Sequence, residues 1–312
     1  MKSILAFTQP LIKVPRWGVT AQELHIGSEK FWIHATPNRA QIFPANCPHR
    51  GTPTEYAVCK NSQYICRYHG KPISPLPFHL VKKFGFWWNI KGEESVPFQN
   101  EKEFSFCGSD RYILEIPFVL AVDNFNEGSH TPYIHSVTGP LPNEWNQTKF
   151  EWSENSEQVK IFYSGPQRNT WVLHGLRAFF PQIWREKLQW SIRWTVDFNP
   201  LRMTYHSIWH RQETPETAEI EMKHLYYLAP LGNDQTIMHT FCFMKRPNVD
   251  GPLGFILKGL ARKFTKNQIR EDQKLYPMIK DSPLSLDKLK LDEYDQPLLA
   301  IREKCSKLYF KL

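Results

Sequence analysis

The chain has 312 residues, which is enough for one large domain or for two ordinary domains that each bury a core. Its aromatic fraction of 14% is too high and too evenly spread for a disordered protein, so the whole chain is expected to be globular. The net charge of +8 is distributed without an arginine-rich tract or a recognisable nucleic-acid-binding module, which argues against nucleic acid and leaves an acidic protein partner or an anionic substrate open.

The sequence offers no export signal and no membrane span. The stretch MKSILAFTQP contains only a short apolar run, and no apolar run elsewhere approaches the ~20 residues of a transmembrane helix. The six cysteines are scattered, and cysteines that stand beside histidines in such a chain indicate metal binding rather than disulfides. We therefore expect a soluble, cytoplasmic protein.

The first hundred residues are predicted to form a small antiparallel β module. The segments FWIHA and RAQIFPA flank the turn-like tripeptide TPN and therefore predict a β-hairpin. The aromatic segment GFWWNI, residues 85–90, predicts the closing strand of the module, because aromatic side chains favour strands and the following KGEE favours a turn.

Two short motifs, NCPHRG and CRYHG, stand between the hairpin and the closing strand. They place cysteine-x-histidine before cysteine-x-x-histidine, with residues 50–65 between the two ligand pairs. Two thiolates and two imidazoles on two loops can hold a [2Fe-2S] cluster, with both sulfurs on one iron and both histidines on the other. The candidate ligands are Cys47, His49, Cys66 and His69.

A glycine follows the histidine of each motif, at Gly51 and Gly70. Glycine permits the close approach of loop backbone that a cluster requires. The alternative is a zinc site on the same four residues, although zinc loops usually open with two cysteines two to four residues apart.

A second candidate site lies in AVDNFNEGSHTPYIH, which contains Glu127, His130 and His135. On a helix, Glu127 and His130 would share a face, whereas the two histidines would be about 140° apart. Convergence of both histidines on one metal therefore requires a distorted segment, and Pro132 between them favours a break in the helix. Two histidines and one carboxylate with open positions are the ligands of oxygen-activating ferrous enzymes.

The third ligand must be a carboxylate that is distant in sequence. The stretch FTKNQIREDQKLYPMI predicts an amphipathic helix near the C-terminus, and within it we choose Asp272 as the ligand. Glu271 and Asp281 are the alternatives.

Residues 150–245 alternate aromatic and polar side chains, as in WSIRWTVDF and MTYHSIWHRQ, and predict long strands of a curved antiparallel sheet that supplies a substrate pocket. Conceivable pocket residues are Arg193, His206, Trp209 and His210. The predicted fold class is α+β, with an N-terminal antiparallel β module over residues 1–100 and a catalytic domain of sheet and helices over residues 101–312.

With both motifs in this order, the chain resembles the Rieske non-haem iron oxygenases, and in particular the compact subgroup that includes dicamba monooxygenase and vanillate demethylase. In that subgroup an asparagine, an acidic residue, a histidine, an aromatic residue and a second histidine keep a fixed spacing. Asn124, Glu127, His130, Tyr133 and His135 match this spacing. The chain departs from the family at two positions, because the family has aspartate where Glu127 stands and usually tryptophan where Lys71 stands.

The resemblance implies a [2Fe-2S] cluster and a mononuclear Fe²⁺ held by His130, His135 and Asp272, with a helix-grip-like catalytic domain. It implies a head-to-tail homotrimer in which Glu127 bridges an iron histidine to a neighbouring subunit's cluster histidine, His69 being the family's choice. The chain has no G-x-G-x-x-G motif, so an external ferredoxin or flavin reductase must supply the electrons.

The implied reaction uses O₂ to hydroxylate or oxidatively demethylate a small organic substrate, with cis-dihydroxylation of an arene as the alternative. Two other classes remain open. A Rieske-type electron carrier would leave about two hundred residues unexplained, and a structural zinc-binding interaction protein would leave the second motif without a purpose.

Overall fold

The computed structural model describes residues 9–26, 29–61, 63–90, 96, 103–168, 188–198, 200–211, 218–245 and 252–308. The chain forms two compact units, Met1–Asn100 with Ala229–Leu231, and Glu101–Leu228 with Gly232–Leu312. The predicted boundary between residues 100 and 101 and the predicted KGEE turn lie outside the described residues. Within the described ranges, no helix is both long and apolar enough to cross a lipid bilayer.

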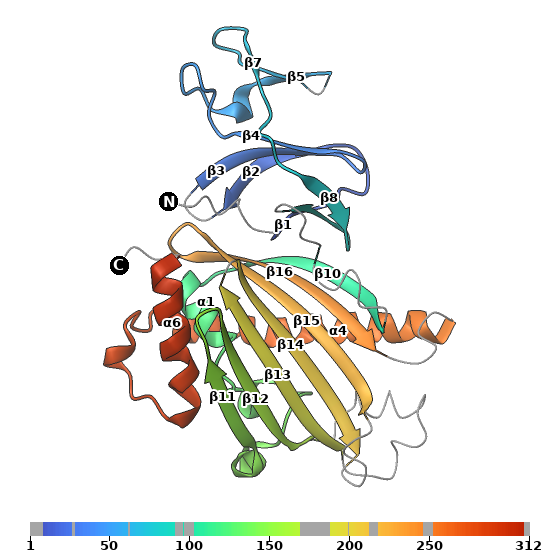
Figure 1. Cartoon of the computed structure of the whole chain (residues 1–312), viewed down its shortest axis with the longest axis vertical. Coiled ribbons are helices and arrows are strands. Elements are labelled where there is room, and N and C mark those ends of the chain that lie inside the picture. The colour runs from blue at the N-terminus through green and yellow to red at the C-terminus, as the bar shows by residue number, and fades with distance from the viewer. Residues whose placement is uncertain are drawn as a thin grey trace. The chain divides into compact units, whose positions relative to one another are not determined.

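The first unit consists of three small antiparallel sheets, drawn in blue and cyan in Figure 1. Their strand orders are β1-β9-β8, β2-β3-β4 and β5-β6-β7. The elements are β1 (Gln9–Lys13), β2 (Thr20–Ile26), β3 (Glu29–Ala35), β4 (Ala40–Pro44), the 3₁₀-helix η2 (Thr54–Tyr56), β5 (Val58–Lys60), β6 (Gln63–Ile65), β7 (Pro72–Ile73), β8 (Leu80–Lys83) and β9 (Phe86–Asn89).

Both strand predictions for this unit are confirmed. β3 and β4 form the predicted hairpin, and the Thr36 side chain closes its turn by accepting hydrogen bonds from the backbone of Asn38 (3.2 Å) and Arg39 (2.9 Å). The segment GFWWNI forms β9, the last strand of the unit along the chain. β9 lies in the middle of its sheet, because its four residues are buried and need neighbours on both sides.

The second unit is built on one seven-stranded antiparallel sheet with the order β10-β16-β15-β14-β13-β12-β11. Helices accompany the sheet, which confirms the predicted α+β class. The strands are β10 (Phe104–Leu114), β11 (Lys149–Glu154), β12 (Gln158–Pro166), β13 (Leu188–Phe198), β14 (Leu201–Arg211), β15 (Ala218–Leu231) and β16 (Gln235–Lys245). The helices are α1 (Phe118–Asn124), α2 (Thr131–Ile134), α4 (Pro252–Gln273), α5 (Tyr276–Ile279) and α6 (Gln296–Leu308), with 3₁₀-helices η3 (Pro142–Gln147), η5 (Leu286–Lys288) and η6 (Glu293–Asp295).

The alternation in the sequence decides which face of this sheet is buried. In β13, Trp190, Ile192 and Trp194 are buried on one face, while Arg193 is exposed on the other. Helix α4 lies across one face of the sheet (Figure 1) and buries a stripe of residues at helical spacing that includes Leu257. The large core therefore lies between the inner face of the sheet and the helices.

Candidate metal centres

The two loops of the first unit have the same backbone conformation. In each loop the cysteine N–H donates to the carbonyl five residues later (2.7 Å for Cys47, 2.9 Å for Cys66). The glycine four residues after each cysteine donates back to that cysteine's carbonyl (2.8 and 2.9 Å) and has a positive φ, +70° at Gly51 and +69° at Gly70. These positions favour glycine because other residues rarely adopt such a φ.

The loops bring three of the four predicted cluster ligands together. The ligand atoms of Cys47, His49 and His69 all lie within 4.8 Å of one another, and the Cys47 Sγ is 3.5 Å from His49 Nδ1 and 3.1 Å from His69 Nε2. Both cysteines of the loops are buried, whereas His49 is exposed and His69 half-buried. The histidine side of this centre therefore faces the surface.

Cys66, the fourth predicted ligand, lies outside this group of three, but its thiol contacts Cys47. Burial raises the pKa of the Cys66 thiol, but hydrogen bonds from the Tyr68 and His69 backbone and from the Cys47 thiol lower it overall. A thiol with a lowered pKa is more readily the thiolate that binds metal. The Nδ1 atom of His69 accepts a hydrogen bond from the Lys71 backbone (3.0 Å), so both ring nitrogens of His69 are engaged within its own unit.

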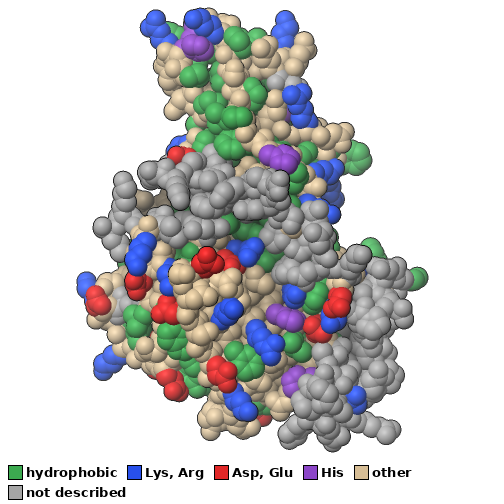
Figure 2. All heavy atoms as spheres, in the orientation of Figure 1, with side chains coloured by type: hydrophobic (Ala, Val, Ile, Leu, Met, Phe, Trp, Pro, Cys, Tyr) green, Lys and Arg blue, Asp and Glu red, His purple; other side chains and the backbone are tan. Residues whose placement is uncertain are grey.

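Basic side chains border these loops. Arg50, Arg67 and Lys71 are all exposed, and Arg50 lies over the ring of the exposed Tyr68 at 5.9 Å. On the face drawn in Figure 2, blue side chains gather near a histidine at the end of the first unit that carries β5 and β7, without acidic side chains among them.

The segment of the second candidate site is not one regular helix, as the predicted convergence of its two histidines requires. Helix α1 ends at Asn124, and the short helix α2 has His130 as its N-cap and His135 as its C-cap. The prediction that Pro132 breaks a helix is wrong. Pro132 lies in the first turn of α2, where proline is tolerated, and the two histidines converge because they flank one short helix.

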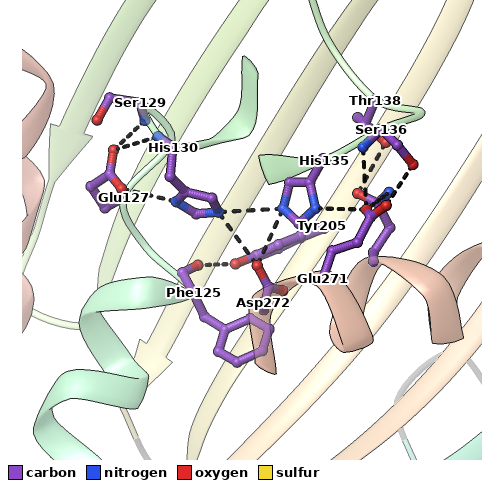
Figure 3. A network of polar contacts seen from close by, with 11 residues as sticks. Phe125, Glu127, Ser129, His130, His135, Ser136, Thr138, Tyr205, Glu271 and Asp272 are labelled. Atoms are coloured by element: carbon purple, nitrogen blue, oxygen red, sulfur yellow. Dashed lines mark hydrogen bonds and ion pairs between the residues drawn. The ribbon is translucent and has the colours of Figure 1, made fainter. Parts of the chain in front are cut away.

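Three ligand atoms form a compact triangle at the centre of Figure 3. His130 Nε2 and His135 Nε2 are 3.3 Å apart, and the Asp272 Oδ1 atom is 3.5 Å from the first and 3.3 Å from the second. The middle of such a triangle lies about 2 Å from each corner, which is a typical metal–nitrogen or metal–oxygen distance. The structure thus brings together the three residues predicted as ligands.

Asp272 has the environment expected of a metal ligand. It lies on the buried face of α4 with only 5% of its surface exposed. Among the residues that the structure describes, none makes a hydrogen bond of good geometry to its Oδ1 atom. A buried carboxylate oxygen without a partner is costly, and a cation between it and the two histidines would satisfy it. The residues therefore fit a divalent metal.

Glu127 holds the outer nitrogen of His130. Its Oε2 atom is 2.9 Å from His130 Nδ1, and its Oε1 atom accepts hydrogen bonds from the backbone of Ser129 and of His130 (3.2 Å). Burial raises the pKa of Glu127, but the hydrogen bonds from His130 and Ser129 outweigh it and hold this pKa below its usual range. Burial likewise lowers the pKa of His130, but Asp272 and Glu127 raise it to about 10.

Glu271 holds the outer nitrogen of His135, as Glu127 holds that of His130. The sequence analysis did not predict this role. Its Oε2 atom is 3.4 Å from His135 Nδ1, and it accepts hydrogen bonds from the hydroxyl and the backbone of Ser136. Burial raises the pKa of Glu271, while the bonds from His135 and Ser136 lower it overall. The adjacent Glu-Asp pair was the only sequence signal. Asp281, the other alternative ligand, is exposed.

A cavity of about 90 Å³ opens beside the three ligand atoms. By this measure it has room for about six waters, or for a small organic molecule. Asn124 lines it, as the resemblance implied for a residue of this site, and its Nδ2 atom has no partner among the described residues. A third of the lining residues are aromatic, including Tyr163, Trp190, Trp194, Tyr205, Tyr226 and Phe264.

The four residues suggested for the pocket are not among those that line the cavity. Arg193 pairs with His206 across β13 and β14, and both lie on the opposite face of the sheet from Trp194, as does His210. Trp209 is on the inner face but donates its Nε1–H to Gln167 (3.0 Å). Part of the predicted pocket region, residues 169–187, 199 and 212–217, lies outside the described residues.

No protein-family model matches the chain, and no curated protein matches its sequence. Its fold is similar to dicamba monooxygenase bound to 3,6-dichlorosalicylic acid, with a TM-score of 0.72, 13% identity, and coverage of 98% of this chain and 97% of the other. It is also similar to Pseudomonas putida CBB5 NdmA with caffeine, with a TM-score of 0.65, 14% identity, and coverage of 96% and 89%. At such low identity the likeness shows a shared fold over the whole chain.

Proposed function

We propose that this chain is the oxygenase component of a Rieske non-haem iron oxygenase, which uses O₂ and external electrons to hydroxylate or oxidatively demethylate a small organic substrate. The observation that carries the proposal is the pair of ligand sets, cysteine and histidine in one unit and two histidines with a carboxylate in the other. The fold shared with dicamba monooxygenase supports monooxygenation over cis-dihydroxylation.

The cofactors are assigned from these two sets. Cys47, His49, Cys66 and His69 hold a [2Fe-2S] cluster, and His130, His135 and Asp272 hold Fe²⁺. When bound, the cluster supplies electrons at moderate potential and the ferrous iron supplies open positions for O₂ chemistry. The protein's own part is geometry, hydrogen bonding and a largely apolar cavity.

Two carboxylates, Glu127 and Glu271, orient the histidine ligands of the iron site. Glu127 and Glu271 accept hydrogen bonds from the Nδ1–H groups of the two histidines, so each Nε2 faces the shared centre and would lose its proton when a cation binds there. Tyr205 donates its hydroxyl proton to the carbonyl of Phe125, which ties the cavity wall to the segment that carries Glu127. The aromatic wall limits the water that reaches bound substrate.

Electrons must come from outside the chain, and an acidic ferredoxin or a flavin reductase is the proposed donor. The exposed Arg50, Arg67 and Lys71 around the cluster loops support this choice, because opposite charges steer encounter. We also propose a cytoplasmic homotrimer in which Glu127 faces the neighbour's His69.

Metal analysis tests the proposal directly. The purified protein should contain two irons and two acid-labile sulfides for the cluster, plus a third iron, and should show the magnetic resonance spectrum of a histidine-ligated cluster. Zinc without sulfide would support a structural zinc protein, and a cluster without the third iron would support an electron carrier. O₂ uptake coupled to product, with a surrogate reductase and a panel of small aromatic substrates, then tests the reaction.

A further inference from the structure

The inner wall of the cavity contains one histidine that takes no part in metal binding. His224 stands on β15 opposite Tyr205 of β14, and only 4% of its surface is exposed. Its Nε2 atom is 2.9 Å from the Thr265 hydroxyl, and its ring is nearly parallel to that of Tyr226 (20°, centroids 6.0 Å apart). The ring is therefore held in one orientation.

The proton on this ring can be located from its neighbours. Thr265 donates its single hydroxyl proton to the carbonyl of Ala261 (3.0 Å), so toward His224 the hydroxyl offers a lone pair. Burial lowers the pKa of His224 to about 4, which keeps the ring neutral. The Nε2 atom thus carries the proton, and the Nδ1 atom is a bare acceptor.

The Nδ1 atom of His224 has no hydrogen-bond partner among the described residues, and His224 lines the cavity. Ser207, diagonally across on the same face of the sheet, also lines the cavity. An acceptor and a hydroxyl beside the aromatic rings of this part of the wall are groups that would orient a bound molecule.

The described side chains around the cavity offer an anionic ligand no cationic partner. No lysine or arginine is found among the described residues that line it, whereas Glu127 and Asp272 are both there. The rings of Tyr226 and Phe264, which also line the cavity, lie beside His224, with centroids 6.0 and 6.5 Å from that of its ring. An uncharged aromatic ligand can stack against the faces of these aromatic side chains.

We propose that His224 determines substrate specificity by accepting, at Nδ1, a hydrogen bond from a small uncharged aromatic substrate that carries a phenolic O–H or an N–H. This rests on the proposed function only in taking the cavity as the substrate site. A ligand without the donor leaves the Nδ1 atom dehydrated and unpaired, which should weaken its binding about tenfold or more.

Titration calorimetry on the full, iron-loaded chain without reductant tests the proposal with three probes of similar size: phenol, anisole and benzoate. Phenol should bind about tenfold tighter than anisole, and benzoate should bind more weakly than either. Binding is measured without turnover, so the result does not depend on the oxygenase activity.

Variants separate the role of His224 from a general effect on the fold. His224→Phe should reduce the preference for phenol over anisole to less than about threefold while anisole still binds. His224→Gln keeps an acceptor oxygen and should retain most of the preference. His206→Phe, on the outer face of β14, is the matched control and should change neither affinity. Thermal unfolding checks that each variant is folded.

Three results would overturn the proposal: equal affinity for phenol and anisole, tighter binding of benzoate than of phenol, or no binding of any probe up to its solubility limit. Metal analysis of the same samples keeps the two hypotheses distinct. A chain that lacks the third iron but prefers phenol would contradict the oxygenase assignment alone. A chain with all three irons and no preference would contradict the role of His224 alone.

Discussion

His130 and His135 each aim one ring nitrogen at a shared centre and give the other to a carboxylate, so neither ring can turn without losing a hydrogen bond (Figure 3). Partners of this kind fix the tautomer of a ligand histidine and raise its basicity. Glu127 and Glu271 therefore act on a bound metal without touching it, and substituting them tests that action with all ligands in place.

The variant Glu127→Gln should lower turnover by about a hundredfold while both metal centres stay occupied. The amide keeps the shape of the side chain but cannot accept hydrogen bonds through two equivalent oxygens, so the hold on His130 and the bridge to a neighbouring subunit both weaken. Steady-state O₂ uptake and iron content measure the two effects. Glu303→Gln, at an exposed position on α6, is the control. Normal turnover in Glu127→Gln would show that electrons reach the iron by another route.

The variant Asp272→Ala should lose the mononuclear iron and leave the cluster intact and reducible. Two histidines alone hold ferrous iron poorly, because the site loses its only charged ligand. Iron and sulfide analysis measures the result, and Asp281→Ala, at an exposed aspartate nine positions away, should keep all three irons. Full iron in Asp272→Ala would make Glu271 the ligand.

At the scale of the elements, each half of the first centre is a single loop, and hydrogen bonds of a cysteine and a glycine fix the conformation of its backbone. Cys66→Ser should lose the cluster and destabilise the first unit, since metal binding supplies folding free energy to small modules. Visible absorption should vanish, and the first unit should unfold at a lower temperature. The second unit has its own large core and should unfold as before. A retained cluster would exclude Cys66 as a ligand.

The elements differ in how far the sequence could predict them. Strands β13 and β14 follow from alternation alone, because one face is buried and the other is not. The same alternation does not say which face meets the cavity, so Arg193 and His206 were chosen in place of Ser207 and His224. That choice is decided by the packing of α4 against the sheet, which is a long-range contact.

The ligands themselves were predictable to different degrees. Cys47, His49 and His69 lie in two short motifs, so local spacing was sufficient to bring them together. Asp272 required a resemblance, because nothing local distinguishes it from the other acidic residues. The contact of Glu271 with His135 was missed, since the two residues are 136 positions apart.

At the scale of the whole molecule, buried neutral histidines make the fold sensitive to acid. Burial lowers the pKa of His224 to about 4, and burial with Arg111 nearby lowers that of His239 to about 3. In the unfolded chain both titrate near 6.5, so between about pH 6.5 and 4 the unfolded state binds more protons and stability falls as the pH falls.

The free energy of unfolding by urea, measured at about pH 7 and about pH 4, should therefore drop on acidification. The His224 contribution is about 3 kcal/mol, since each unit of pKa shift is worth about 1.4 kcal/mol. In His224→Gln the acid-induced drop should be smaller by about this amount. The same drop in the variant as in the parent would show that His224 does not stay neutral when the chain is folded.

The net charge of +8 and the exposed Arg50, Arg67 and Lys71 beside the cluster loops should attract an acidic electron donor. Reduction by an acidic ferredoxin should slow as salt rises from low to physiological concentration, because screening weakens the attraction. Stopped-flow absorbance of the cluster measures the rate. Arg67→Glu should slow reduction at low salt by about tenfold, while Lys290→Glu, at an exposed site in the other unit, should not. A reduction rate that does not change with salt concentration would mean that these charges only offset the charge of the cluster.

The order of ligands along the chain has a consequence for biosynthesis. The last ligand of the first centre is His69, so all of its ligands have been translated when less than a third of the chain has been made. Asp272 follows all seven strands of the large sheet and lies beyond Glu271, itself 136 positions after His135. The nascent chain can thus receive its cluster while translation continues. The mononuclear iron can be inserted only after the last strand and most of α4 have been translated.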